Sequence, residues 1–216
     1  MDTVVVLDIV RKGTPLNLGQ DAEKEFRHRN IRLLRGGYLT MPLVYVLAKS
    51  KLFLAAIVFA EGAGEDVKVG DDIGMTNKEL VQAWARIKKD DLSSAAKAEL
   101  ETSINKLIDD EEKRFVDFFN KASPITTRMH SLELMPGIGK KHMWEIIENR
   151  RKPFESLQDI KDKIPLILDP KRSLKERILK ELEEKEKYYF FVLPPRRPQM
   201  DGYGRPETSA RRFRRP

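Results

Sequence analysis

The chain has 216 residues, no cysteine, 40% hydrophobic and 35% charged residues, and a formal net charge of +7. This length allows one large or two small domains with a buried core, and the composition excludes collagen-like, mucin-like and fully disordered chains. The lack of cysteine excludes disulfides, cysteine-ligated metals and thiol nucleophiles. Asp2 and Asp8 lie where a signal peptide would be basic and then apolar, so we expect a cytoplasmic protein.

The first part of the chain is rich in short β-branched and apolar runs separated by turn residues. We expect strands at 3–10, 31–34, 38–47, 52–60 and 67–73. The apolar stretch 43–60 is long enough to raise the question of a membrane span, but Lys49 and Lys51 near its middle favour a turn between two buried strands. Five short strands with close turns predict a small OB-like β-barrel over residues 1–76.

From Thr76 onward the apolar residues recur every three or four positions, which predicts helices. The expected helices cover 78–88, 93–122, 126–134, 140–149, a segment opening at Ser156, and 173–187. Trp84 and Trp144 are expected to pack between them. The fold class is therefore α+β: the barrel, then an all-α domain over 77–187, a closing strand at 188–193, and an arginine-rich tail at 194–216 that should be disordered when free.

The positive charge is gathered into three islands around one acidic segment. Residues 24–37 hold five basic residues and one acidic residue, and 137–152 hold five basic and two acidic. The tail, 194–216, has seven arginines against two acidic residues, whereas 61–112 has fourteen acidic and seven basic residues. This separation suggests a polyanionic partner bound on a defined face, although solvated charged helices would give a similar pattern.

The most informative segment runs from Leu132 to Ile160 and resembles the helix-hairpin-helix motif, with its hairpin at 136–139. Two glycines, Gly137 and Gly139, allow a tight turn and a close approach of another chain. The turn leads into a helix start whose free N–H groups and positive dipole end favour a phosphate. Ile138 should point inward and pin the corner to the core. A plain helical hairpin or a protein contact remains an alternative.

Three groups of residues form the predicted nucleic-acid site. The first group comprises the hairpin and the cations after it: Gly137, Ile138, Gly139, Lys140, Lys141, Arg150, Arg151 and Lys152. The second pairs Arg35 with Tyr38, an aromatic residue placed to stack on a base. The third lies in the tail: Arg196, Arg197, Arg211, Arg212, Arg214 and Arg215. Asp159 stands where a DNA glycosylase would carry its catalytic aspartate, but its capping pattern favours a helix cap.

The whole chain, except the tail after Leu193, resembles an uncharacterised archaeal family described as RNA-binding, whose members join an OB-like barrel to a helical domain with this hairpin. The resemblance is carried by VLDIV (6–10), DDLSSAAKAEL (90–100) and EEKRFVDFFNKASPITTRMHSLELMPGIGKKHMWEIIENRRKPFESLQDI (111–160). It implies the two-part architecture and a nucleic-acid ligand. The family's genes often stand beside genes of translation and of rRNA modification, which implies ribosomal RNA.

Together these observations predict a non-catalytic RNA-binding protein with no cofactor and no metal, in contact with ribosomal RNA and with ribosomal proteins. The three histidines have no metal-binding spacing, and no nucleophile and base are paired. Two alternatives stay open. One is a DNA repair or replication accessory that uses the same hairpin, and the other is a protein scaffold that docks a basic partner on the acidic segment.

Overall fold

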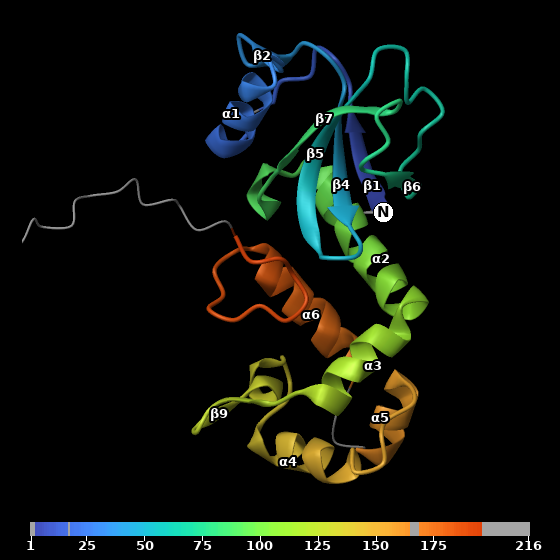
Figure 1. The fold of residues 1–216 in the computed structure, drawn as a ribbon, viewed down its shortest axis with the longest axis vertical. Coiled ribbons are helices and arrows are strands. Elements are labelled where there is room, and N and C mark those ends of the chain that lie inside the picture. Colours follow the sequence, from blue (N-terminus) through green and yellow to red (C-terminus); the bar gives the residue numbers. More distant parts are fainter. Residues whose placement is uncertain (1–2, 17, 165–168, 196–216) are drawn as a thin grey trace, which may run out of the picture.

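The computed structural model describes residues 3–16, 18–164 and 169–195. An antiparallel five-stranded sheet lies at one end of the described structure, and most of the helices lie at the other end (Figure 1). The sheet contains β1 (Thr3–Val10), β4 (Leu43–Ala48), β5 (Phe53–Phe59), β6 (Asp72–Gly74) and β7 (Val81–Arg86), in the order β6-β1-β4-β5-β7. The apolar stretch 43–60 is thus two strands and a turn, as expected.

Both faces of this sheet are covered, which explains why its central strands are almost continuously apolar. Val5 and Leu7 of β1 belong to the cluster under the helices, while Val4 and Val6 belong to a second cluster on the other face. The connection between β5 and β7 contributes Val67 and Leu80 to that second cluster. The register between β1 and β4 shifts after Val6, and such irregularities increase the curl of a sheet.

The curled sheet is a half-barrel, where the sequence predicted a small OB-like β-barrel. In the described residues β6 and β7 each pair with one neighbour only, so both are edges. Residues expected to extend the sheet are used elsewhere: β2 (Leu34–Arg35) and β3 (Tyr38–Leu39) pair with each other in a separate hairpin. α1 (Gln20–His28) precedes this hairpin. The strand β6 is short and pairs only with residues 3–5, so the sheet stays open.

The expected helix at 78–88 is wrong, because this segment forms strand β7. Its residues alternate in burial, with Val81, Ala83 and Ala85 inside, and it pairs with the free edge of β5. The period is therefore two, and pairing with β5 outweighs the local helix signal. The sheet consequently extends past the expected boundary at residue 76, and Trp84 lies on a strand beside Phe53.

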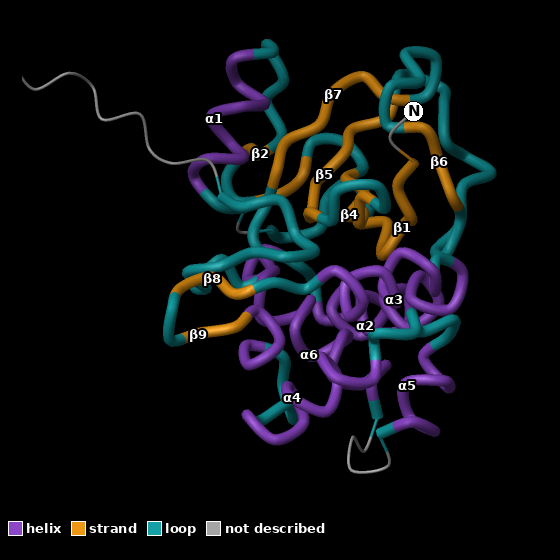
Figure 2. Tube along the Cα trace, turned by 60° about the horizontal axis from the view of Figure 1, so that its bottom comes forward, coloured by secondary structure: helices purple, strands orange, loops and turns teal. Residues whose placement is uncertain are grey.

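The long helix expected at 93–122 is two helices, α2 (Ser94–Asp110) and α3 (Glu112–Lys121), separated at Glu111. A 3₁₀ turn, η1 (Lys89–Asp91), precedes α2, and the Ser93 hydroxyl caps α2 by accepting from the Ala96 N–H at 3.0 Å. α2 packs against β1, and Figure 2 shows it at the boundary between the strands and the helices. It joins the two parts into one core: the same apolar cluster contains Val5 and Ile178.

The helix expected at 126–134 is also wrong. Its place is taken by a hairpin of β8 (Pro124–Thr126) and β9 (Met129–His130), followed by a 3₁₀ helix η2 (Ser131–Leu134). The Ser131 N–H and hydroxyl both donate to the Ser123 carbonyl, at 3.1 and 2.8 Å, which ties the ends of the hairpin together. These bonds between side chain and backbone compete with a helix at this position.

The remaining helices are α4 (Lys140–Asn149), α5 (Leu157–Lys163) and α6 (Pro170–Leu182). Ser156 caps α5 by accepting from the Asp159 N–H, and Asp159 is part of this cap, since its carboxylate accepts from the Glu155 N–H at 3.1 Å. The closing strand expected at 188–193 is reduced to one bridge, between Val192 and Leu52. The tail from residue 196 onward lies outside the described residues.

Candidate nucleic-acid interface

The corner before α4 is exposed to solvent and is fixed from behind. Gly137 has a φ of +80°, which L-residues with a side chain rarely adopt, and both Gly137 and Gly139 are exposed. Ile138 is 4% exposed and lies in the main core cluster, as the sequence predicted. The Ser173 hydroxyl of α6 donates to the Pro136 carbonyl at 2.6 Å. The core therefore holds the corner rigid while its glycines face water.

The start of α4 presents unpaired backbone N–H groups next to two cations. The Met143 N–H donates to the Gly139 carbonyl at 2.9 Å, so the amides of residues 140–142 precede the first bond inside the helix. Gly139, the residue before the helix, supplies no capping side chain. Lys140 and Lys141 are exposed, and neither forms an ion pair with any residue in the described ranges. This arrangement of amides, helix dipole and cations attracts an anion.

Three cations follow α4. Two of them form no ion pair among the described residues, and the third forms hydrogen bonds that stabilise the fold. The Arg150 Nη1 donates to the carbonyls of Phe119 and Ala122, at 3.1 and 2.7 Å, and so caps the end of α3. Arg150 therefore does not present its guanidinium freely to a phosphate as predicted. Arg151 and Lys152 are exposed and have no ion-pair partner among the residues that the structure describes.

The prediction that Trp144 packs between helices is wrong, because most of its side chain is exposed to solvent. Its side chain is 64% exposed and lies on the outer side of α4, opposite the buried Met143 and Ile146. A helical wheel would have separated Trp144 from these apolar residues and placed it beside Lys140 and Lys141, four and three positions earlier. The exposed aromatic residue of this surface was thus missed although the sequence contains the signal.

The two residues of the other predicted pair, Arg35 and Tyr38, lie opposite each other in the β2–β3 hairpin. Gly36 and Gly37 both have positive φ values and form its turn. Tyr38 is 55% exposed, and the chain before α1 runs alongside it through a bridge at Pro15. Arg11 and Lys12 lie just before that bridge and are exposed. The hairpin is therefore a second basic surface that carries an exposed aromatic side chain.

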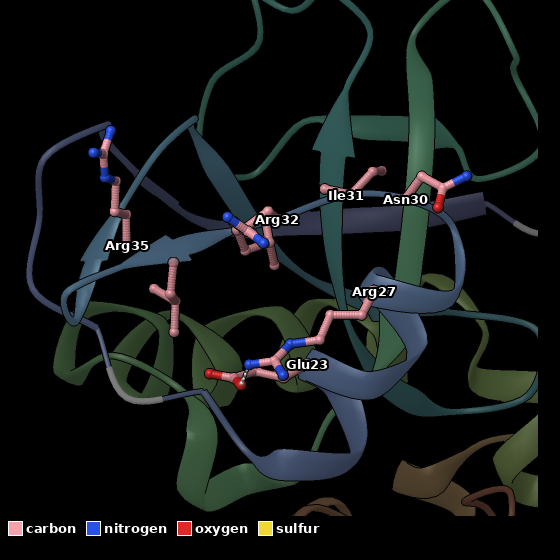
Figure 3. A pocket seen from close by; sticks show the side chains of 8 residues that line it. Glu23, Arg27, Asn30, Ile31, Arg32 and Arg35 are labelled. Carbon is pink, nitrogen blue, oxygen red and sulfur yellow. Dashed lines mark hydrogen bonds and ion pairs between the residues drawn. The ribbon is translucent and has the colours of Figure 1, made fainter.

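Beside this hairpin is a cavity of about 600 Å³ (Figure 3). Its lining comprises Glu23, Arg27, Asn30, Ile31, Arg32, Leu33, Leu34 and Arg35. Figure 3 shows Arg27 directed at Glu23, with which it forms an ion pair at 3.1 Å. Arg32 and Arg35 form no ion pair in the described part of the chain, so they are the cations of this cavity that remain available.

The structure does not bring the predicted site residues together into one patch. The β2–β3 hairpin lies at one end of the long axis of the molecule, and α4 lies at the opposite end (Figure 1). The tail arginines Arg196, Arg197, Arg211, Arg212, Arg214 and Arg215 lie outside the described residues. The chain just before the tail is fixed by Arg86, whose guanidinium donates to the carbonyls of Leu193 and Pro194.

The titratable groups with shifted pKa values lie within structural contacts. Burial raises the pKa of Tyr45 to about 12, aided by Asp91 and Asp8, and its hydroxyl has no hydrogen-bond partner among the described residues. The pKa of Asp159 is lowered, first by its hydrogen bond from Lys163 and then by the Glu155 N–H, as suits a helix cap. Among the described residues, no three His, Asp or Glu side chains form a group suited to a metal ion.

None of the helices in the described ranges is long and apolar enough to cross a bilayer.

The fold and this surface define a mixed α/β protein with a half-barrel and a rigid, basic, glycine-containing corner. The chain belongs to the family "Protein of unknown function (DUF655)", whose model matches residues 1–193. It is 43% identical over 133 residues to the uncharacterized protein MJ0038 of Methanocaldococcus jannaschii, covering 59% of this chain and 60% of that protein. The crystal structure of Af1531 from Archaeoglobus fulgidus is similar with a TM-score of 0.69 and 35% identity, over 89% of this chain and 100% of that one.

Proposed function

We propose that this protein is a non-catalytic RNA-binding protein that holds a backbone phosphate of RNA at the corner before α4. The observation that carries this proposal is the exposure of Gly137, Gly139, Lys140 and Lys141 around the unpaired amides of the helix start. Such a site recognises the sugar-phosphate backbone and reads no base sequence. Arg151 and Lys152 at the other end of α4 provide a neighbouring contact.

The corner serves the role of the hairpin in a helix-hairpin-helix motif, with one difference. The helix before the corner is the four-residue 3₁₀ helix η2, not an α-helix. The geometry that matters for a phosphate lies after the corner, in the positive φ of Gly137 and in the open start of α4. The proposal therefore depends on the second helix and the turn.

The β2–β3 hairpin and the arginine-rich tail supply further contacts in this proposal. Arg32 and Arg35 can bind phosphates, and Tyr38 beside them can stack on a base. Because the hairpin and α4 lie at opposite ends of the molecule, an RNA that touches both must be large or folded (Figure 1). This favours structured RNA, with ribosomal RNA as the proposed ligand and ribosomal proteins as neighbours in the cytoplasm.

A salt titration of RNA binding tests the proposal. Fluorescence anisotropy with a labelled structured RNA should show affinity falling steeply with salt, as expected for several phosphate contacts. Lys140→Glu combined with Lys141→Glu should weaken binding and reduce the slope of log K against log salt by about 1.5.

The matched control reverses two lysines of α2, Lys97→Glu with Lys106→Glu, which are exposed and change the net charge equally. If both double variants lose the same RNA affinity, the change in net charge alone explains the loss, and a site at the corner is contradicted. Competition with duplex DNA decides between ligands: tighter binding to DNA than to RNA would favour a DNA-repair or replication accessory instead.

A further inference from the structure

We infer that Trp144 is a stacking platform for an unpaired RNA base, so that the RNA segment bound at α4 is a loop or single strand and not a regular duplex. This inference rests on the proposed function and specifies its ligand. The first observation is the exposure of Trp144. Its exposed fraction of 64% is the highest among the exposed large apolar side chains of the described residues.

The two tryptophans differ in the ring contacts that they form among the described residues. Trp84, by contrast, lies against Phe53 with ring centroids 6.1 Å apart, and the Arg29 guanidinium lies 5.9 Å from its ring. In the described part of the chain, Trp144 has neither an aromatic neighbour nor a cation over its ring. An indole left in water has an apolar face available to a ligand.

The charges around Trp144 indicate what that ligand is. Lys140 and Lys141 precede it by one helical turn and share its side of α4, so an anionic group and a flat apolar group would be bound side by side. A nucleotide has both groups. The acidic residues of α4, Glu145 and Glu148, come after Trp144, so the positive charge on this helix is concentrated at its start, at Lys140 and Lys141, which is where a phosphate would be held.

A protein partner fits this surface less well. A stable protein interface buries roughly 800 Å² on each partner around an apolar centre. Here a single indole is surrounded by charged side chains, and the other exposed large apolar residues of the described ranges, Tyr38, Val69 and Leu193, are not on α4. One aromatic ring among lysines is instead the arrangement that proteins use to bind single-stranded nucleic acid.

The ring requires an unpaired base because bases within an A-form duplex are stacked on one another and closed to a side chain. Stacking of RNA bases on aromatic side chains therefore concentrates on loops, bulges and ends. The corner before α4 holds the backbone, and Trp144 would hold the base of a nearby nucleotide. The corner alone does not distinguish paired from unpaired RNA, so Trp144 supplies the selectivity.

The experiment uses the full chain and two RNAs of equal length, an unstructured single strand and a perfect duplex. Trp84→Phe leaves Trp144 as the only tryptophan, because the sequence contains two. Its fluorescence should be quenched by the single strand and much less by the duplex. In anisotropy titrations, Trp144→Ala should weaken single-strand binding about tenfold with an unchanged salt slope, whereas Trp144→Phe should retain most of the affinity.

Each outcome has a distinct meaning, provided circular dichroism shows that the variants are folded. If Trp144→Ala binds the single strand as tightly as the wild type, or loses equal affinity for both RNAs, the stacking inference is overturned. If the wild-type chain self-associates in sedimentation and Trp144→Ala does not, the surface is a contact between copies and the inference is also overturned. If Lys140→Glu with Lys141→Glu leaves RNA binding intact, the proposed function itself fails.

Discussion

Glu181 is a fully buried carboxylate that fixes the last described segment of the chain. It accepts hydrogen bonds from the Arg177 Nε at 2.8 Å and from the backbone N–H groups of Phe190, Phe191 and Val192 at 2.9–3.1 Å. Arg177 is 3% exposed and also donates to Glu186. A buried charge is tolerated only when it is paired and fully hydrogen-bonded, and here both conditions hold.

Replacing this carboxylate should strongly destabilise the fold. Glu181→Gln removes the negative charge that pairs with Arg177. It also replaces one acceptor oxygen by an NH₂ group, which cannot accept the hydrogen bonds of the backbone N–H groups. We expect a loss of about 3–5 kcal/mol in the free energy of unfolding, measured by urea denaturation. Glu183→Gln is the control: its ion pair with Lys89 is partly exposed to solvent and should contribute less than about 1 kcal/mol. Equal effects would contradict the role given to Glu181.

His130 makes the segment before the corner sensitive to pH. Its Nδ1 accepts from the Leu132 N–H at 3.1 Å, which requires a neutral ring. Burial and then Arg150 lower its pKa below the ordinary value of 6.5, against the opposing effect of Glu133. The unfolded chain thus binds a proton more readily, so the stability from His130 is complete above pH 6.5 and falls as the pH drops below it.

Urea denaturation at pH 7.5 and pH 5.5 tests this behaviour. The wild-type chain should lose more stability between the two values than His130→Asn, whose amide oxygen can accept the same hydrogen bond without titrating. The same loss in both chains would show that other groups cause the pH dependence.

Residue roles that depend on neighbours in sequence could be predicted, and those that depend on distant contacts could not. The inward position of Ile138 follows from its place between two turn glycines, and the cap at Ser156 follows from the local pattern. Arg150, in contrast, appears as a free cation in the sequence, because the carbonyls that it caps lie about thirty residues earlier. The apolar character of Trp144 alone predicts burial, whereas its helical register with Lys140 and Lys141 places it on the exposed side of α4.

At the scale of elements, the corner before α4 contains two glycines with different duties. Gly137 has a positive φ, so its backbone conformation requires glycine. Gly139 has φ −86° and ψ 178°, an extended conformation open to any residue, and an added Cβ would meet no atom within 4 Å. Gly139 is therefore not needed for the fold, and its lack of a side chain keeps the amides of α4 open.

The two alanine variants should separate these duties. Gly137→Ala should cost roughly 1–2 kcal/mol of stability, because a Cβ clashes with its own backbone at positive φ. Gly139→Ala should leave the stability unchanged or slightly raised, yet weaken RNA binding, since its methyl group obstructs the approach of a phosphate. Thermal unfolding and anisotropy measure the two effects. An unchanged RNA affinity in Gly139→Ala would contradict close approach at this residue.

Elements were predicted well where the local pattern had one interpretation. Strands β1, β4 and β5 and helices α4 and α5 appear near their expected positions. The errors at 78–88 and 126–134 both fall on short segments with ambiguous periods, the first decided by pairing with a distant strand and the second by a local hairpin. β7 pairs with β5, and the β8–β9 hairpin is tied by Ser131 to Ser123. A periodicity found over such short segments does not outweigh these contacts.

At the scale of the whole molecule, the expected OB-like barrel and the helical domain after it form one continuous structure with a single main core. The open sheet buries one face under α2, and the cluster formed there extends through α6 to Phe191. Closure of a barrel depends on how edge strands pair, which local sequence does not specify. The basic surfaces at the β2–β3 hairpin and at α4 are consequently held at opposite ends of one core (Figure 1).

Photo-crosslinking of the full chain to structured RNA, with mass spectrometry of the crosslinked peptides, most directly tests the claim that the corner before α4 binds RNA. The account predicts crosslinks within residues 136–152, with Trp144 among the modified positions, and their loss in the Lys140→Glu, Lys141→Glu variant. Crosslinks confined to residues 24–38 or to the arginine-rich tail, with none around α4, would contradict it.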